Sequence, residues 1–330
     1  RPGELVFSDR LLGEVDTALG RDQQVILLRN RRGYAPILLC RACGRDHACD
    51  DCGLPRTLHQ RPSRLLCHYC GSLEAVPERC GACDEAALEA IGAGTERVEE
   101  RFRELFPGVE VDVLDRDAVR RVGSTGKILD RFGRRETRVL VGTQMVSKGH
   151  HFPGVALTAV LHADAYLGFP DFRAVERTYS LLTQLAGRAG RGEDPGKIVI
   201  QTHHPDHYAI RAALEHDDAA FAEQEMRFRR IFHYPPYTRM TQLLLRGANR
   251  SRVEGEAGAL ALRLDRRLAG EDVRISGPAP APFAKLRGKW RYQLLLRGER
   301  PRVIRRAIEE ALAEGMKTEV VVDVDPQQLL

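Results

Sequence analysis

Long hydrophobic runs are missing from this sequence. In its 330 residues no stretch approaches the roughly 18 apolar residues that a membrane-spanning helix needs, and the first residues lack the charged-then-apolar pattern of a secretory signal. With 43% hydrophobic and 29% charged residues, the composition also excludes disorder, a coiled coil and collagen. We therefore expect a soluble cytoplasmic protein of two or three domains. Because the chain starts at Arg1 and soon reaches an apolar strand, we also expect it to be part of a longer protein.

Lysine is scarce: only six of the 51 basic residues are Lys, and the other 45 are Arg. The arginine side chain forks onto phosphates, but a codon-biased genome explains the same excess equally well. The net charge of +5 is modest for this length and does not by itself indicate nucleic-acid binding.

Cysteine is absent outside one short window. All eight cysteines lie between Cys40 and Cys83 and form four Cys-x-x-Cys pairs. Without a secretory signal a disulfide framework is not expected, whereas four thiolates close a tetrahedron around zinc and a Cys-x-x-Cys turn presents two of them. The pattern therefore predicts two structural zinc ions.

The gaps between the pairs indicate which cysteines share an ion. Cys52 and Cys67 have 14 residues between them, close to the interval of a two-knuckle zinc ribbon, whereas five separate Cys43 from Cys49. A nested pairing is expected, which also brings the ends of the segment together. The two ligand sets are then Cys40, Cys43, Cys80 and Cys83, and Cys49, Cys52, Cys67 and Cys70. Since eight thiolates fill two tetrahedra, the side chains expected to face solvent are those of His47, His59 and His68.

Strands and helices alternate on both sides of the cysteines. Apolar runs of strand length, and apolar residues at helical spacing, predict a parallel sheet covered by helices on both faces. The strands are expected at 23–30, 109–114, 139–142, 156–162 and 198–201, and the helices near 94–106, 127–132 and 174–186. The cysteine-rich segment, residues 39–90, is then an insertion in an α/β domain that comprises residues 1–38 and 91–204.

Two stretches of this α/β region carry candidate chemistry. Residues 141–153 run from a strand end into a polar loop with glycine, the usual position of a ligand site on an open parallel sheet. Residues 184–191 (QLAGRAGR) follow an apolar helical face, so that Arg188 and Arg191 are expected where the helix ends in a flexible loop. Arginines placed there reach a phosphate across a cleft, as arginine fingers do.

These motifs resemble the primosomal protein N-prime (PriA) family, the bacterial replication-restart helicases of superfamily 2. The resemblance runs almost from end to end. Besides the cysteines, it rests on residues 30–34 (NRRGY), 92–96 (GAGTE), 142–144 (GTQ), 148–153 (KGHHFP), 184–191, 201–205 (QTHHP), 234–236 (YPP), 277–278 (GP) and 323–326 (DVDP).

The resemblance implies a RecA-like helicase lobe in an ATP-dependent DNA helicase that moves 3′ to 5′, recognises stalled forks and starts primosome assembly. It implies the nested zinc pairing, ATP and Mg²⁺ as cofactors of the full-length protein, and a nucleoid location. The implied partners are forked and single-stranded DNA, primosome proteins and single-stranded-DNA-binding protein.

The resemblance also assigns roles to residues. The fifth helicase motif, which couples nucleotide to the DNA strand, corresponds to residues 142–152, and the sixth places arginines at the ATP γ-phosphate. In the sixth motif the catalytic residues would be Gln184, Arg188 and Arg191. The nucleotide-binding residues would be Gly142, Lys148, Gly149 and Gly187, and the residues at the DNA strand would be Thr143 and Gln144.

The nucleotide site is incomplete in this chain. Residues 123–127 (GSTGK) imitate a phosphate loop, but the first glycine of Gly-x-x-x-x-Gly-Lys-Ser/Thr is absent and Ile128 stands where a hydroxyl should coordinate magnesium. We interpret this stretch as a loop that enters a helix. The chain is expected to correspond to the C-terminal half of a motor and to be inactive alone.

The last third of the sequence has a different character. Residues 205–236 form charged helices, and residues 237–330 give strand, helix, strand, strand, helix, strand, the split βαβ order of a small α+β domain. Between its middle strands, residues 285–292 (KLRGKWRY) are basic with two aromatics, the composition that follows a phosphate backbone and stacks on a base. The candidate DNA contacts are Lys285, Arg287, Lys289 and Trp290. Alternatively, Trp290 and Tyr292 enter the domain core.

Two functions of different class remain. In the first, the chain belongs to an ATP-dependent DNA helicase. In the second, it is a zinc-bearing DNA-binding or partner-binding module that has lost its motor. The intact sixth motif favours the first, because arginine fingers need a phosphate to meet.

Overall fold

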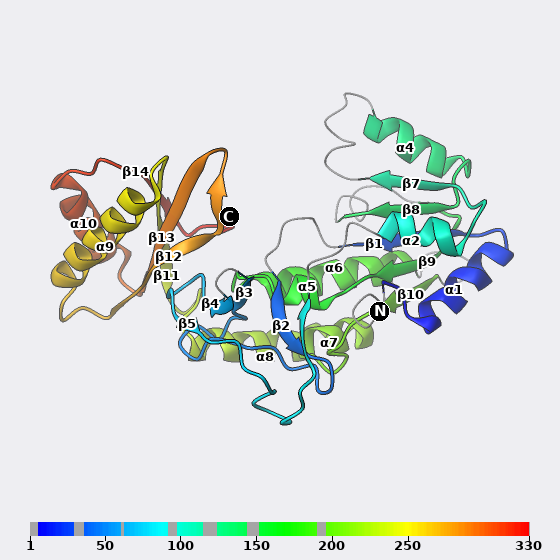
Figure 1. The fold of residues 1–330 in the computed structure, drawn as a ribbon, viewed down its shortest axis with the longest axis horizontal. Helices are drawn as coiled ribbons and strands as arrows, with labels where there is room; N and C mark the ends of the chain where they lie inside the picture. Colours follow the sequence, from blue (N-terminus) through cyan, green and yellow to red (C-terminus); the bar gives the residue numbers. More distant parts are fainter. Residues whose placement is uncertain are drawn as a thin grey trace. The chain divides into compact units, whose positions relative to one another are not determined.

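The computed structural model describes residues 6–29, 36–60, 63–91, 98–114, 124–143, 152–189 and 196–329 (Figure 1). The chain divides into two compact units. Unit 1 comprises Arg1–Arg45, Arg79–Gly168 and Arg173–Phe221, and unit 2 comprises Asp46–Glu78, Phe169–Phe172 and Ala222–Leu330.

A five-stranded parallel sheet lies at the centre of unit 1. Its strand order is β10-β9-β1-β8-β7, and every neighbouring pair is parallel. The strands are β1 (Gln24–Leu28), β7 (Val111–Leu114), β8 (Val139–Gly142), β9 (Val155–Val160) and β10 (Lys197–Ile200). The predicted parallel sheet is thus confirmed.

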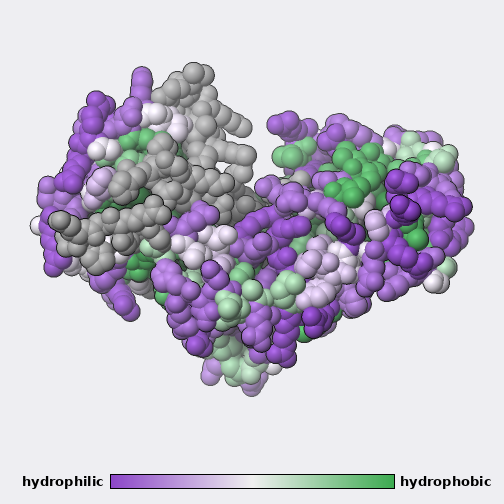
Figure 2. Space-filling model, turned by 180° about the vertical axis from the view of Figure 1, so that it is seen from behind, coloured by the Kyte–Doolittle hydropathy of each residue, from purple (hydrophilic) through white to green (hydrophobic). Residues whose placement is uncertain are grey.

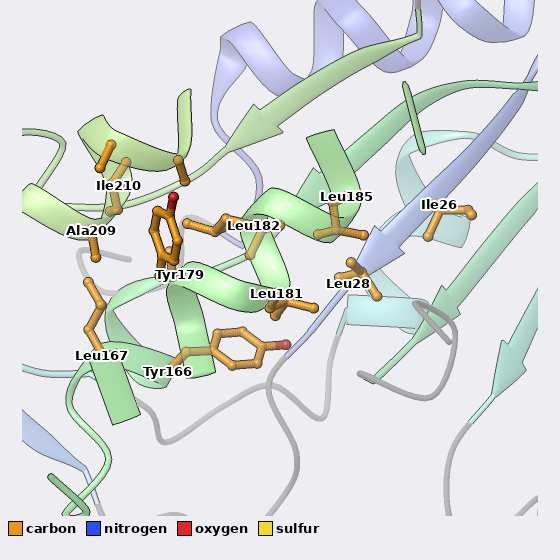
Figure 3. Close-up of a cluster of buried hydrophobic side chains, with 14 of the residues drawn as sticks. Ile26, Leu28, Tyr166, Leu167, Tyr179, Leu181, Leu182, Leu185, Ala209 and Ile210 are labelled. Carbon is orange, nitrogen blue, oxygen red and sulfur yellow. The ribbon is translucent and has the colours of Figure 1, made fainter. Parts of the chain in front are cut away.

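Helices cover both faces of this sheet, because successive side chains of each apolar strand point to opposite sides. Val25 and Leu27 of β1 pack with α1 (Asp9–Gly20) and α2 (Val98–Leu105). Ile26 and Leu28 belong to the opposite cluster, shown in Figure 3. Its helices are α4 (Ser124–Gly133), α5 (Asp164–Leu167), α6 (Ala174–Ala189) and α7 (Tyr208–Glu215).

The cysteine-rich segment forms short antiparallel strands. In unit 1, β2 (Ile37–Cys40) pairs with β6 (Leu88–Ile91). In unit 2, β4 (Ser63–Leu66) pairs with both β3 (Thr57–Gln60) and β5 (Leu73–Glu74). Each unit therefore contains one part of the cysteine-rich segment, and the strands within each part are antiparallel.

The C-terminal part of unit 2 is a four-stranded antiparallel sheet with order β12-β13-β11-β14. Two helices pack on one face of it (Figure 1). In chain order the elements are α8 (Asp218–Ile231), β11 (Arg239–Gly247), α9 (Arg250–Arg267), β12 (Val273–Leu286), β13 (Lys289–Gly298), α10 (Pro301–Ala313) and β14 (Glu319–Val324). After α8 the order is that of the split βαβ arrangement.

The sequence left open whether Trp290 and Tyr292 contact DNA or enter the domain core, and the structure places Tyr292 in the core. Tyr292 is 3% exposed and lies in the core beneath the helices, with Leu294 and Leu296 on the same face of β13. Its neighbour Trp290 is only half buried.

Hydrophilic residues dominate the face of the molecule shown in Figure 2, with smaller hydrophobic areas between them. Among the described helices, none has the length and apolar character to cross a membrane.

Gln24 carries a buried polar contact at the start of β1. Its Nε2 donates to the carbonyl oxygens of Phe132 at 2.7 Å and Thr137 at 2.9 Å, and the residue is 2% exposed. The amide thereby ties the end of α4 to the sheet and satisfies two buried acceptors.

We predict that Gln24→Ala lowers the free energy of unfolding of unit 1 by about 1–3 kcal/mol, since it leaves two buried carbonyl groups unpaired. The measurement is chemical denaturation followed by circular dichroism. Gln23→Ala is the matched control, since that neighbour is half exposed and is expected to change stability by less than about 0.5 kcal/mol. Equal effects of the two substitutions would contradict the role given to the Gln24 amide.

Candidate functional site

All four Cys-x-x-Cys turns have the same backbone geometry. In each, the amide of the first cysteine donates to the carbonyl five residues ahead, and the amide four residues ahead donates back to the first cysteine's carbonyl, at 2.6–3.0 Å. The residue after each second cysteine has a positive φ: Gly44 74°, Gly53 64°, Gly71 82° and Asp84 58°. This left-handed conformation favours glycine and tolerates Asp, which explains the residue found after each pair.

The turns bring eight sulfurs together as two groups of four. The groups are Cys40, Cys43, Cys80 and Cys83 (site 1) and Cys49, Cys52, Cys67 and Cys70 (site 2), each with its sulfur atoms within 4.8 Å of one another. This is the nested arrangement expected from the spacing.

The sulfur positions fit tetrahedral zinc. Bonds of about 2.3 Å to one ion place the sulfurs of a tetrahedron about 3.8 Å apart. The Sγ–Sγ distances are 3.6 Å for Cys40 and Cys83, 3.8 Å for Cys43 and Cys80, and 3.6 Å for Cys49 and Cys70. The residues present therefore suit one zinc ion in each site.

The proton balance of site 2 also calls for a cation. A hydrogen bond with Cys52 lowers the pKa of Cys49 to about 5, and the same hydrogen bond raises the pKa of Cys52. Four adjacent sulfurs therefore do not all ionise by themselves. A divalent ion bound by these four sulfurs would replace the shared protons and hold all four as thiolates.

The two sites differ in how they are embedded. In site 1 two sulfur ligands, Cys43 and Cys83, belong to exposed residues, and the other two are buried. In site 2 three cysteines are buried and Cys70 is half buried. Ser72 lies beside site 2, with its Oγ 3.2 Å from the sulfur of Cys70.

Site 2 is continuous with the hydrophobic core of unit 2. Its cysteines share one buried cluster with Tyr69, Phe172, Tyr234 and Leu295. The hydroxyl of Tyr234 donates to the carbonyl of Cys52 at 3.0 Å, and the ring of Tyr234 stacks on that of Phe172 at 4.9 Å and 6°. The aromatic cluster thus holds the first knuckle of site 2 by packing and by a hydrogen bond.

Polar contacts hold the second knuckle against β13. Gln293, which is fully buried, donates from Nε2 to the carbonyl of His68 at 2.8 Å. Nδ1 of His68 lies 2.8 Å from the carbonyl of Pro280, and a Cβ at Gly71 would lie 2.8 Å from the carbonyl of Pro278. The approach is so close that only glycine fits at position 71.

The expectation that His68 faces solvent is wrong. Its side chain is 2% exposed, and burial lowers its pKa to about 4. The eight cysteines supply all the metal ligands, so His68 is not needed as one. A residue that is not a ligand can still be buried. Its ring fills the space between the second knuckle and β12, which the order of residues does not reveal.

Two candidate residues of the second group lie at the carboxyl end of β8. Gly142 is the last residue of β8, and Thr143 follows it half buried. Gln184 is exposed on α6. Four further candidates lie outside the described residues, namely Gln144, Lys148, Gly149 and Arg191.

The helix ends later than expected, because α6 continues to Ala189, so that Gly187 and Arg188 lie in its last turn and not in the loop after it. The helix extends because Leu181, Leu182 and Leu185 stay buried against the sheet. This packing offsets the cost of about 1 kcal/mol for one glycine within a helix.

One polar cluster at this edge is not predicted by the sequence. Asp164, 2% exposed after β9, accepts from the Thr202 hydroxyl at 2.8 Å and from the His203 amide at 3.1 Å. His162 before it has a φ of 50°. Residues 201–205 carry part of the family resemblance, but nothing in the sequence pairs them with Asp164.

The basic segment of unit 2 is a tight hairpin between β12 and β13. Arg287 (φ 50°) and Gly288 (φ 80°) form its two-residue turn, and both are exposed. The Nζ of Lys285 lies 5.1 Å from the centre of the Trp290 ring, and the guanidinium of Arg250 lies 5.3 Å from it. The ring of Trp290 therefore makes cation–π contacts with two basic side chains.

Two family models match parts of this chain. Residues 230–327 match the primosomal protein N C-terminal domain, and residues 49–74, which contain site 2, match the PriA DNA helicase Cys-rich region domain.

Curated proteins named replication restart protein PriA match nearly the whole chain. The protein of Haemophilus influenzae is 37% identical over 98% of this chain and 45% of its own length. The corresponding values are 36%, 97% and 40% for Bacillus subtilis, and 37%, 99% and 50% for Treponema pallidum. The chain thus spans about half the length of these relatives or somewhat less.

We predict two zinc ions per chain and unequal consequences of removing them. Cys67→Ser is expected to lose one ion and to destabilise unit 2 by on the order of 4 kcal/mol, because site 2 lies in its core. Cys83→Ser is expected to lose the other ion and to leave the unfolding of unit 2 unchanged. Metal analysis and thermal unfolding measure both. One ion in the unmodified protein, or equal destabilisation of unit 2 by the two variants, would contradict this description.

Proposed function

Because this chain belongs to the PriA family of replication restart proteins, we propose that it forms part of an ATP-dependent 3′-to-5′ DNA helicase acting at stalled forks. The observation that carries the proposal is the match over nearly the whole chain, together with two four-cysteine sites in the nested arrangement. The ligands would be forked and single-stranded DNA, and the partners primosome proteins and single-stranded-DNA-binding protein.

In this proposal the parallel sheet of unit 1 is a RecA-like lobe. It comprises residues 1–38 and 91–204, with residues 39–90 as the zinc insertion. The carboxyl end of such a sheet is where nucleotides bind, and Gly142 and Thr143 lie there. Bound ATP with Mg²⁺ supplies the phosphoryl group whose hydrolysis drives translocation.

The packing of α6 supports the proposal that the sixth motif lies near the nucleotide site at the carboxyl edge of the sheet. Figure 3 shows Leu185 beside Leu28, the last residue of β1, so this part of α6 lies at the carboxyl edge of the sheet. Arg188 follows one helical turn later. We propose that Arg188 and Arg191 stabilise the γ-phosphate held by the other lobe, and that Gln184 assists them.

The hairpin between β12 and β13 is the proposed DNA contact of unit 2. Its exposed cations Lys285, Arg287 and Lys289 surround a tight turn, and Trp290 lies beside them half buried. Cations around a ring are typical of single-strand contacts, where phosphates meet the charges and a base meets the ring.

The second candidate function is a zinc-bearing DNA-binding module without a motor. The continuity of site 2 with the core of the C-terminal sheet favours it, because unit 2 then has a metal-supported core of its own. The two candidates differ in ATP hydrolysis and agree on DNA binding.

We predict that the 330-residue chain hydrolyses no ATP with or without DNA, since its one phosphate-loop-like sequence, residues 123–127, lacks the first glycine and the hydroxyl of a phosphate loop. In the longer protein, Arg191→Ala is expected to lower turnover by roughly 10³-fold and to leave DNA affinity unchanged. Steady-state hydrolysis and DNA titration measure this. If the longer protein also fails to hydrolyse ATP, the motorless module is the correct candidate.

For the hairpin, we predict that Arg287→Ala with Lys289→Ala flattens the plot of log affinity against log salt by about 1.4, since each phosphate released from a single strand contributes about 0.7. Trp290→Ala is expected to cost about 1–3 kcal/mol if a base stacks on the ring. Fluorescence anisotropy with labelled oligothymidylate provides both values. A double variant with an unchanged slope would exclude the hairpin as a DNA contact.

A further inference from the structure

Arg291 is a buried cation whose charge is not balanced by any described residue. It lies on the face of β13 opposite the two helices and is 5% exposed. Its Nη1 is sealed from solvent and makes no hydrogen bond within the described part of the chain. Burial, followed by the charge of Arg246, lowers its pKa. An arginine in this state is costly to the fold, because its buried Nη1 loses hydration without gaining a hydrogen bond.

The strand register places a second cation directly beside it. Arg246 of β11 is paired with Arg291 on one side and with Glu319 of β14 on the other. Side chains paired in this way across antiparallel strands lie about 5 Å apart at Cβ, and like charges there are destabilising. The row Arg291, Arg246, Glu319 thus contains two adjacent positive charges.

The single carboxylate of this row is already occupied. Arg246 donates to one oxygen of Glu319, and Lys289 of β13 donates to the other at 3.0 Å. These hydrogen bonds hold the pKa of Glu319 at about 2, so the group stays ionised. The cluster then has three cations and one anion, and Arg291 is the cation that this carboxylate does not reach.

Arg297 is a second buried arginine on β13, and its contacts can be compared with those of Arg291. It lies on the same face of β13, six residues further, and is 1% exposed. Its Nη1 donates to the carbonyl of Phe232 and its Nη2 to the hydroxyl of Ser276, both at 2.8 Å, and its guanidinium stacks on Tyr234 at 4.8 Å. Both terminal nitrogens of this buried arginine are therefore paired, and only its Nε makes no hydrogen bond within the described part of the chain.

We propose that Arg291, together with Arg246 and Lys289, forms a binding site for one backbone phosphate of single-stranded DNA on this face of the sheet. The proposal rests on the proposed DNA-binding function and adds a site beyond the hairpin turn. A phosphodiester supplies the negative charge and the acceptor oxygens that the planar guanidinium lacks. Arg246 and Lys289 keep 40% and 52% of their side chains exposed, so a phosphate meets these two cations first. Arg291 is 5% exposed, and its side chain has to turn outward to join them.

The site predicts opposite effects on stability and on binding. Arg291→Met removes a buried charge that the fold does not compensate, so the thermal midpoint is expected to stay the same or to rise. The same substitution is expected to weaken binding of a labelled oligothymidylate about tenfold at low salt and to flatten the salt plot by about 0.7. A packing role predicts the reverse, a lower midpoint with an unchanged slope.

Two further variants sharpen the test. Arg291→Lys keeps the charge and loses the planar donors, so it is expected to preserve the slope and to lose part of the affinity. Arg274→Met is the matched control, because Arg274 is an exposed arginine on β12. It removes the same charge and is expected to leave the affinity within about twofold and the slope unchanged.

The outcomes separate this proposal from the proposed function. If the unmodified chain binds oligothymidylate and Arg291→Met behaves like Arg274→Met, the phosphate site is excluded while DNA binding stands. If the unmodified chain does not bind, DNA binding by unit 2 fails. In that case the anion site is tested by measuring the thermal midpoint with inorganic phosphate at constant ionic strength. Phosphate supports that site if it raises the midpoint of the unmodified chain but not of Arg291→Met, and overturns it if both respond alike.

Discussion

The structure of unit 2 depends on one arrangement, the four cysteines of site 2 lying inside a hydrophobic core. Cys52 is joined to Tyr234 by a hydrogen bond, and Leu295 of the C-terminal sheet belongs to the same cluster. The same residues would therefore take part in metal ligation and in core formation. Zinc bound at this site would supply folding free energy to the C-terminal domain as well as to its own short loops.

Site 1 uses the same backbone turns with a different result. Cys43 and Cys83 are exposed, Cys40 and Cys80 are buried, and the backbone of Gly44 in the first turn lies close to that of His203. Because two of its four ligands are exposed, an ion there would contribute less to a hydrophobic core than one in site 2. Two sites with the same ligands thus have different energetic consequences, because burial differs.

The basic residues of unit 2 also divide by their surroundings. The whole chain has a net charge of only +5, so its average charge attracts DNA weakly. Three arginines of the C-terminal sheet differ in their surroundings. Arg297 is held by hydrogen bonds, and Arg287 is exposed on a turn. Arg291 is buried, and no described residue forms a hydrogen bond with its Nη1. Recognition on this domain is therefore expected to come from local geometry.

The features that depend on spacing and periodicity can be predicted from the order of residues alone. The intervals between cysteines are sufficient for the nested sites, since a knuckle has a fixed size, and the apolar runs are sufficient for a parallel sheet with helices on both faces. Strand and helix order in the last third could likewise be read from the chain, because each element has its own period.

Packing between distant segments determines what fills the space between elements. It buried His68, continued α6 through Gly187 and Arg188, and set Asp164 against Thr202. It also placed Arg246 beside Arg291, residues 45 positions apart in the chain. These outcomes depend on packing between distant segments, and the free energy of such contacts is set by neighbours that local sequence patterns do not identify.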